Sequence, residues 1–249
     1  MAIALCVVPG MSAQMATHVL QSRQFSELYI NGAMNVECRH SEDSAGMIIY
    51  KSTPQVADAL DCHNAGDRLN ISMEKISSSV LRNGLSTIVV YYSGQLSTAS
   101  FTGSGSLTLE TPPLGQSAAL LLTGSGKFKV NNVTAMRVSC SVTGSGTMSI
   151  AGKTSAKNVT CTVSGSGAIE IAHVNAKTAS VTVNGPGDML INGIADKASF
   201  ALKGSGQIDA SNFKCTALTS GVYGSGKVYY NKGVSTVNTS GKKENIIAR

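Results

Sequence analysis

Large and charged side chains are scarce in this chain. Tryptophan is absent, aromatic residues make up 5% of the 249 residues, and charged residues make up 14%. So little aromatic bulk predicts a thin, aliphatic core in place of a thick globular one. No apolar run approaches the roughly 20 residues that a membrane-spanning helix requires. No transmembrane segment is therefore expected.

Cysteines with the spacing of a metal or redox motif are also missing. The six cysteines include no CxxC pair, which argues against a zinc cluster and against a disulfide framework. Cys140 and Cys161 occupy equivalent positions in neighbouring repeats. Their side chains would stack in parallel about 4.8 Å apart, a poor geometry for a bridge, so buried free thiols are favoured over a disulfide.

Catalytic constellations are the third absence. The acidic residues of the repeats stand alone and the four histidines are scattered, so no acid–base pair, nucleophile or metal cluster is indicated. Gly221 to Lys227 fits the G-x-x-x-x-G-K phosphate-loop pattern, but Val228 replaces the Ser or Thr that would hold magnesium. Asp188 is the one aspartate that follows a repeat turn, which argues against calcium. We expect no enzyme, no metal and no cofactor.

What the chain contains instead is a repeated Gly-x-Gly turn. Seven copies recur at intervals of 19 to 21 residues, a period typical of solenoids. Glycine suits a sharp corner because it adopts positive φ at no steric cost. The first glycines of the turns are Gly103, Gly124, Gly144, Gly165, Gly185, Gly204 and Gly224.

Alternating apolar residues surround each turn. Ile169 and Ile171 follow one turn, and Val159, Cys161 and Val163 precede it. Period-two alternation predicts strands, and equivalent strands that stack close a continuous core. The sequence therefore predicts an all-β fold, a right-handed parallel β-helix (β-solenoid) with coils of about 20 residues. A third register holds small residues and predicts a tight interior corner: Gly94, Gly115, Ala135, Ala156, Ala176, Ala195 and Cys215.

A single β-helix domain is expected over residues 14–249, with irregular N-terminal coils over 14–100 and regular Gly-Ser-Gly repeats over 101–241. Residues 1–13 are interpreted as the remnant of a signal peptide cleaved after Ala13, because a short apolar run precedes small residues. The positive charges that usually precede such a run are absent. An ordinary apolar N-terminus is the alternative.

The irregular part is predicted to hold several strands and one short helix. Alternation or β-rich composition marks the strands, and the helix is the single helix-like stretch of the chain. The strands are expected at 25–38, 47–50, 69–73 and 87–92, and the helix around Pro54 to Leu60.

Positive charge gathers in the repeats. Residues 101–249 carry fourteen Lys or Arg against six Asp or Glu, whereas residues 1–100 carry six against eight. The lysines are spread without interleaved aromatic residues, so nucleic-acid binding is not expected. Attraction to an acidic polysaccharide or a negative cell surface is one interpretation, and simple solvation with protection against aggregation is the other.

The outward side of the strands before the turns is nearly all hydroxyl. Stacked coils would align these residues into a flat ladder that meets a glycan or a protein through many weak hydrogen bonds. Threonine is also simply a good residue for an exposed strand. The residues predicted to bind a ligand are Thr143, Thr160, Thr162, Ser164 and Thr182.

Two elements in this order resemble a known family. The opening Phe-x-x-Leu-x-Ile-x-Gly, from Phe25 to Gly32, is followed by Gly-Ser-Gly turns that begin at Gly103. Over about residues 23–241 this order resembles the bacterial putative auto-transporter adhesin head domain known as the GIN domain. The resemblance implies an exported β-helical protein, common in Bacteroidetes-like envelopes, and brings no catalytic residues with it.

Three functions follow, in decreasing order. The first is an exported adhesin, periplasmic, secreted or on the cell surface, that binds a glycan or a surface protein. The second is a structural envelope solenoid that assembles as a homo-oligomer through an exposed end, where Lys242 and Lys243 are predicted to form a protective cap. The third is a polysaccharide-active enzyme.

Overall fold

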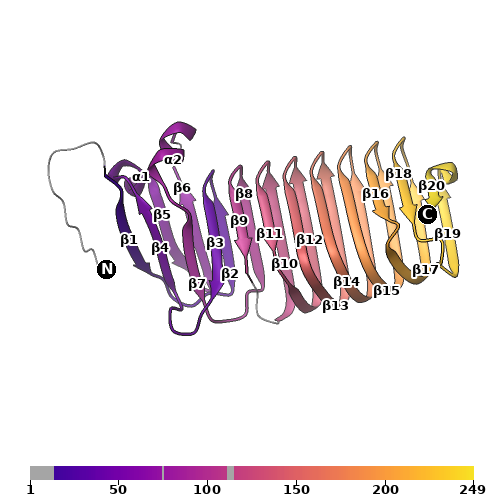
Figure 1. Cartoon of the computed structure of the whole chain (residues 1–249), viewed down its shortest axis with the longest axis horizontal. Helices are drawn as coiled ribbons and strands as arrows, with labels where there is room; N and C mark the ends of the chain where they lie inside the picture. Colours follow the sequence, from indigo (N-terminus) through magenta and orange to yellow (C-terminus); the bar gives the residue numbers. More distant parts are fainter. Residues whose placement is uncertain (1–13, 75, 111–114) are drawn as a thin grey trace.

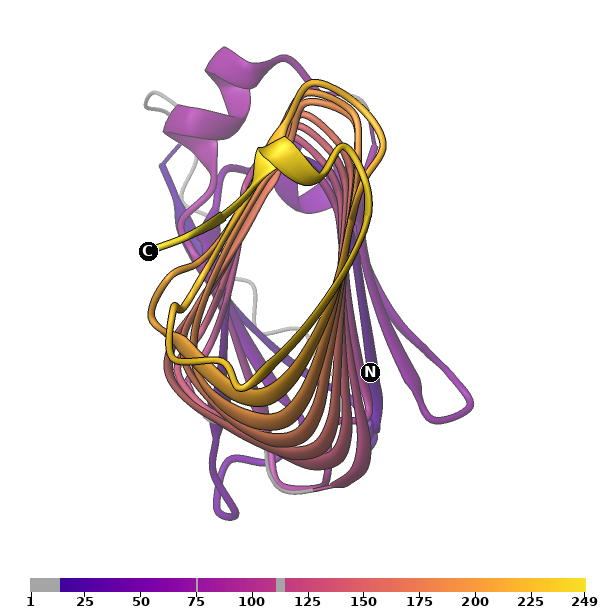
Figure 2. The same cartoon turned by 90° about the vertical axis from the view of Figure 1, so that its right-hand side faces the viewer.

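The chain folds into an elongated β-solenoid. A computed structural model describes residues 14–74, 76–110 and 115–249, and the predicted signal-peptide remnant lies outside the described residues. Coils stack along one axis, and the two ends of the chain lie at opposite ends of the rod (Figure 1). Viewed along the axis, the coils superimpose into one flattened outline (Figure 2). The predicted parallel β-solenoid is confirmed.

Each regular coil has a strand before the Gly-x-Gly turn and a strand after it. Strands before the turns are β8 (Thr98–Gly103), β10 (Gly115–Gly124), β12 (Val133–Gly144), β17 (Phe213–Val222) and β19 (Thr236–Gly241). Strands after the turns are β9 (Ser106–Leu109), β11 (Lys127–Val130), β16 (Gln207–Ala210), β18 (Lys227–Tyr230) and β20 (Ile246–Ala248). Three longer strands join one turn to the next: β13 (Thr147–Gly165), β14 (Ala168–Asn184) and β15 (Asp188–Lys203).

Equivalent residues of neighbouring coils pair in parallel. Val159 lies between Val138 and Ala179 in the strands before the turns, and Ile169 lies between Met148 and Met189 in the strands after them. We name the two resulting walls the pre-turn sheet and the post-turn sheet. The predicted apolar ladders point between them and are buried, Ile169 with 0% of its surface exposed. Full burial of such a side chain contributes about 1.5–3 kcal/mol to stability.

The glycines of the turns are required by conformation and by space. The first glycine has positive φ in six of the seven turns, for example 108° at Gly165, and Gly224 is the exception. A Cβ atom at the second glycine of that turn, Gly167, would lie 2.5 Å from the carbonyl oxygen of Gly146 in the coil below. A side chain at either position would push neighbouring coils apart.

The small-residue register is confirmed over most of its length. Gly115, Ala135, Ala156, Ala176, Ala195 and Cys215 pair in sequence across six coils. Ala135 and Ala195 are buried, whereas Ala156, Ala176 and Cys215 are half-buried, so this corner borders the core without lying wholly inside it. Gly94 was wrongly included, because it is exposed and no atom lies within 4 Å of its would-be Cβ.

The first coils of the solenoid are stacked out of chain order. Strands β2 (Glu27–Asn31) and β3 (Asn35–His40) form one coil, and β6 (Arg68–Met73) and β7 (Ile88–Tyr92) form another. β2 pairs with β6 on one side and with β8 on the other, while β3 pairs with β7 and β9. The coil at 27–40 is therefore enclosed between two coils that come later in the sequence.

Antiparallel strands close the N-terminal end of the rod. β1 (Ala16–Gln21) pairs with β4 (Met47–Ser52), and β5 (Leu60–Ala65) pairs with β6. The predicted helix is confirmed as α1 (Pro54–Ala59), and the four predicted strand segments coincide with β2 and β3, β4, β6 and β7. Helix α2 (Ser78–Gly84) was not predicted. Its seven residues are too few to display a helical period.

The C-terminal end has no such cover in the described part of the chain. β19 and β20 form the last coil and are joined through a 3-10 turn, η1 (Lys243–Asn245). Lys242 and Lys243 are exposed beside these edge strands, as expected of charges that discourage further strand pairing. The guanidinium carbon of Arg249 lies 3.3 Å from the ring centre of Tyr229 and fixes the chain end against β18.

Cys140 and Cys161 pair in register inside the solenoid, and both are buried free thiols, as predicted. A hydrogen bond between the two thiols is the main reason that the pKa of Cys161 lies well above its ordinary value, and burial adds to it. A thiol in such a position is part of the core and is a poor nucleophile.

Candidate functional site

The predicted hydroxyl ladder lies on the outward face of the pre-turn sheet. Ser141, Thr162 and Thr182 form one row across three coils, and Thr143 and Ser164 stand side by side in the next row. Thr143 and Thr160 are exposed, whereas Thr162, Ser164 and Thr182 are half-buried. The structure thus brings all five residues together on one face of adjacent strands, about 4.8 Å apart from coil to coil.

These five hydroxyl groups are free to bind a partner. None of them makes a hydrogen bond through its side chain within the described chain, so each offers a donor and acceptors to solvent. Nearby, Thr178 donates a hydrogen bond to Oδ1 of Asn158 over 2.8 Å and links two coils at the edge of the ladder. The face is flat, polar and repeated.

Unpaired positive charges border this face. Arg137 and Lys197 lie in one row of the pre-turn sheet, and Lys203 lies beside Asn184. Every ion pair of the described residues lies in the first 110 residues, so the cations of the repeats have no acidic partner there. They give the face a positive potential that salt would screen.

The same face continues into a groove at its N-terminal end, which the sequence did not reveal. The groove has a volume of about 400 Å³. It is formed where β5, β6, β2 and β8 lie side by side. Its lining residues are Tyr29, Ile30, Asn31, His63, Asn70, Ile71, Ser72, Ser100 and Thr102.

Two polar clusters hold the side chains of this groove. His63 Nδ1 lies 2.8 Å from a carboxylate oxygen of Asp61, and its Nε2 lies 3.5 Å from Nδ2 of Asn70. Arg68 donates to a carboxylate oxygen of Glu27 over 3.0 Å, and its guanidinium carbon lies 4.0 Å from the ring centre of Tyr29. Each cluster joins residues from neighbouring strands and therefore restricts their rotamers.

A chain signal for part of this groove exists. Gly66 and Asp67 form the turn between β5 and β6, with φ of 63° at Gly66, and a Gly-Asp pair between alternating segments is typical of a hairpin. The pairing of β6 with β2 across about forty residues has no such signal. The groove depends on that pairing.

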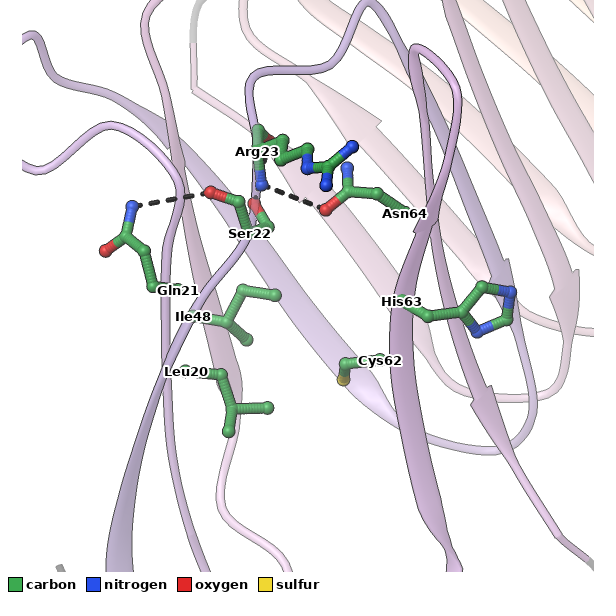
Figure 3. Close-up of a pocket in the computed structure, with 8 residues that line it drawn as sticks. All are labelled: Leu20, Gln21, Ser22, Arg23, Ile48, Cys62, His63 and Asn64. Atoms are coloured by element: carbon green, nitrogen blue, oxygen red, sulfur yellow. Dashed lines mark hydrogen bonds between the residues drawn. The ribbon is translucent and has the colours of Figure 1, made fainter. Parts of the chain in front are cut away.

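A second hollow opens at the N-terminal end of the rod (Figure 3). It has a volume of about 450 Å³. Cys62 points inward toward Leu20 and Ile48, whereas His63 points the opposite way, toward the outer face. Arg23 and Asn64 stand at its rim, where the backbone N–H of Arg23 donates to Oδ1 of Asn64 over 2.9 Å. Burial raises the pKa of Cys62 to about 12, so its thiol stays protonated at neutral pH.

The acidic residues of the repeats do not pair on the post-turn sheet. Glu170 and Asp209 share a row, but Leu190 stands between them. Within the described residues, no three His, Cys, Asp or Glu side chains are grouped as a metal site would need. The face therefore offers hydrogen bonds and charge to a ligand, and no assembled acid–base pair.

Comparison with known proteins identifies the architecture. The family model of the putative auto-transporter adhesin, head GIN domain, matches residues 24–192 and 154–242.

The chain belongs to this family.

The resemblance first inferred from Phe25 to Gly32 and the Gly-Ser-Gly turns is thereby confirmed. No curated protein matches the chain.

Solved structures share the fold of this GIN-domain chain at low sequence identity. A putative adhesin from Parabacteroides distasonis is 17% identical with a TM-score of 0.81, covering 95% of this chain and 97% of that one. A putative lipid binding protein from the same species is 21% identical with a TM-score of 0.78, covering 94% and 96%. A putative adhesin from Parabacteroides merdae is 15% identical with a TM-score of 0.72, covering 95% and 96%. The family and both adhesins carry no enzyme description.

No helix among the described residues has the length and apolar character needed to cross a membrane.

Proposed function

We propose that this GIN-domain chain is an exported adhesin, secreted, periplasmic or on the cell surface, that binds a glycan or a surface protein through the outward face of its pre-turn sheet. The observation that carries the proposal is the register of the hydroxyl ladder, in which Ser141, Thr162 and Thr182 repeat along three coils without internal partners. A rigid row of unpaired hydroxyls matches a ligand that itself repeats. The family description supports the adhesive role.

Many weak contacts would supply the affinity. A hydrogen bond that replaces one to water contributes about 0.5–1.5 kcal/mol, so one hydroxyl binds little and a row of five binds measurably. The unpaired cations beside the ladder would add attraction to acidic polymers and would lose it at high salt. The predicted signal peptide at residues 1–13 supports export.

The test compares binding to glycan and matrix-protein arrays before and after the ladder is blocked. Residues 14–249 are assayed beside the Thr160→Glu/Thr162→Glu variant at low and moderate salt. We expect the variant to lose at least tenfold in affinity, while the Thr236→Glu variant, altered on the last coil, binds as the native chain does. Equal binding of all three proteins would refute the role of the ladder.

A second candidate function is the binding of an acyl chain in the hollow at the N-terminal end. Leu20, Ile48 and Cys62 give it an apolar floor, and Arg23 at the rim offers a cation to a carboxylate. One protein of the same fold is described as a putative lipid binding protein. Palmitate should then protect Cys62 from maleimide while Cys215, half-buried in the repeats, reacts at an unchanged rate. Unchanged labelling of both thiols would dismiss this candidate.

A further inference from the structure

We propose that the groove lined by Tyr29, His63 and Asn70 is a binding site for one or two pyranose units of a neutral glycan. The inference rests on the proposed adhesive function and names a site outside the hydroxyl ladder. With a volume of about 400 Å³, the groove lies within the roughly 300–1,000 Å³ typical of small-molecule sites. It combines an aromatic ring with polar side chains that are already held in place.

Tyr29 provides the surface on which a sugar ring would stack. The guanidinium of Arg68 covers one face of the Tyr29 ring at 4.0 Å, and Arg68 is itself held by Glu27. Arg68 does not line the groove, whereas Tyr29 does. The groove therefore meets Tyr29 on the side that Arg68 leaves open, and the ring is fixed from behind. The apolar C–H face of a pyranose packs against such a ring.

Polar side chains stand around the ring at the places where sugar hydroxyls would lie. Asn70 and Ser100 pair directly with Tyr29 on its two neighbouring strands. Asn70 presents an amide with donor and acceptor atoms, and His63 is oriented by Asp61 over 2.8 Å. Planar amide and imidazole groups can donate to one sugar hydroxyl and accept from the next. Both neighbours of the ring thus offer hydrogen bonds.

The charges around the groove favour a neutral ligand. Asp61 and Glu27 contribute negative charge, and the one guanidinium beside Tyr29, that of Arg68, is paired with Glu27. No unpaired Lys or Arg lines the groove. A uronate or a phosphate would find no free cation here, in contrast to the repeats with their unpaired lysines. The groove and the ladder therefore differ in the ligands that they attract.

The groove leads into the hydroxyl ladder. Tyr29, Ser100, Leu121, Ser141 and Thr162 form one continuous row across five coils. A glycan whose terminal units sit in the groove would extend along this row. The groove would then bind the end of the chain, and the ladder would bind its length.

The test uses four variants on an array of neutral oligosaccharides ending in glucose, galactose, mannose or N-acetylglucosamine, with hexuronic-acid oligomers beside them. Hits are followed by calorimetry. Tyr29→Ala and Asn70→Ala each should weaken binding of the neutral ligand at least tenfold, whereas Tyr29→Phe, which keeps the ring, should stay within about threefold. Tyr223→Ala is the matched control, because Tyr223 is 57% exposed near the opposite end and should change nothing. Circular dichroism confirms that each variant is folded.

The ladder variant Thr160→Glu/Thr162→Glu separates this inference from the proposed function. Loss of binding in the groove variants establishes the groove, whatever the ladder variant does. Loss in the ladder variant, with native affinity in Tyr29→Ala and Asn70→Ala, overturns the groove and leaves the adhesive ladder. Binding of hexuronic-acid oligomers or of proteins alone, unaffected by the groove variants, also overturns it.

Discussion

Replacing Ile169 by aspartate tests which side of each strand faces the core. Ile169 is fully buried between Met148 and Met189 in the post-turn sheet. The change removes about 1.5–3 kcal/mol of apolar burial and places a carboxyl group, without a partner, where burial costs about 2–7 kcal/mol. The combined loss of about 4–10 kcal/mol is comparable with the whole stability of a typical domain, about 5–15 kcal/mol.

Ile194→Asp is the matched control, since it makes the same chemical change on the surface. Ile194 is 50% exposed and pairs with Asn175 and Lys214, so an aspartate there gains a cation as neighbour. We expect a change within about 0.5 kcal/mol, as is usual for surface substitutions. The assay is the urea unfolding midpoint followed by far-ultraviolet circular dichroism. A soluble Ile169→Asp protein with the midpoint of Ile194→Asp would refute the assignment of inward and outward residues.

Three further predictions concern the turns, the pH dependence and the C-terminal end. Gly165→Ala should lower stability by about 1–3 kcal/mol, because φ is 108° and the new Cβ would lie 2.6 Å from a carbonyl oxygen, while Gly94→Ala, with open space around it, should leave the thermal midpoint unchanged. Burial raises the pKa of Cys62 from 9.0 to about 12, so the folded protein retains a proton there that the unfolded chain loses above pH 9; stability should fall as pH rises through 9 to 12, less steeply in Cys62→Ala, and identical pH profiles of the urea midpoint would contradict this. Lys242→Thr/Lys243→Val should increase concentration-dependent association in light scattering, because it removes charge from the uncovered edge strands; a variant that stays monomeric at all concentrations would show that these lysines do not protect the end.

The repeated part of the fold could be predicted because its interactions are local and periodic. The alternation of Val159, Cys161 and Val163 identifies inward residues, and the turn glycines give the period that aligns neighbouring coils. Each coil pairs with the one about 20 residues away, so one rule repeated along the chain gives the register. The ladder of hydroxyls, including Thr160 and Thr162, follows from the same rule.

The N-terminal part could not be predicted in the same way. β2 meets β6 and β8 across long stretches of chain, with Arg68 bonded to Glu27 over 41 residues and Ser97 to Ser26 over 71. Alternation shows that each segment is a strand but not which strand is its neighbour. The groove around Tyr29 exists because of these pairings. A binding site of that kind lies beyond a reading of sequence period.

The insertion of the coil at 27–40 between two later coils also determines when each part of the molecule can fold. As the chain leaves the ribosome, this coil is synthesised first, yet one of its neighbours ends at residue 92 and the other at residue 109. Closing such long loops costs entropy before any contact forms, whereas the repeats close loops of about 20 residues. We therefore expect assembly to nucleate among the repeats and to finish at the N-terminal end. The groove would be the last surface to form, and its appearance would mark a completed molecule.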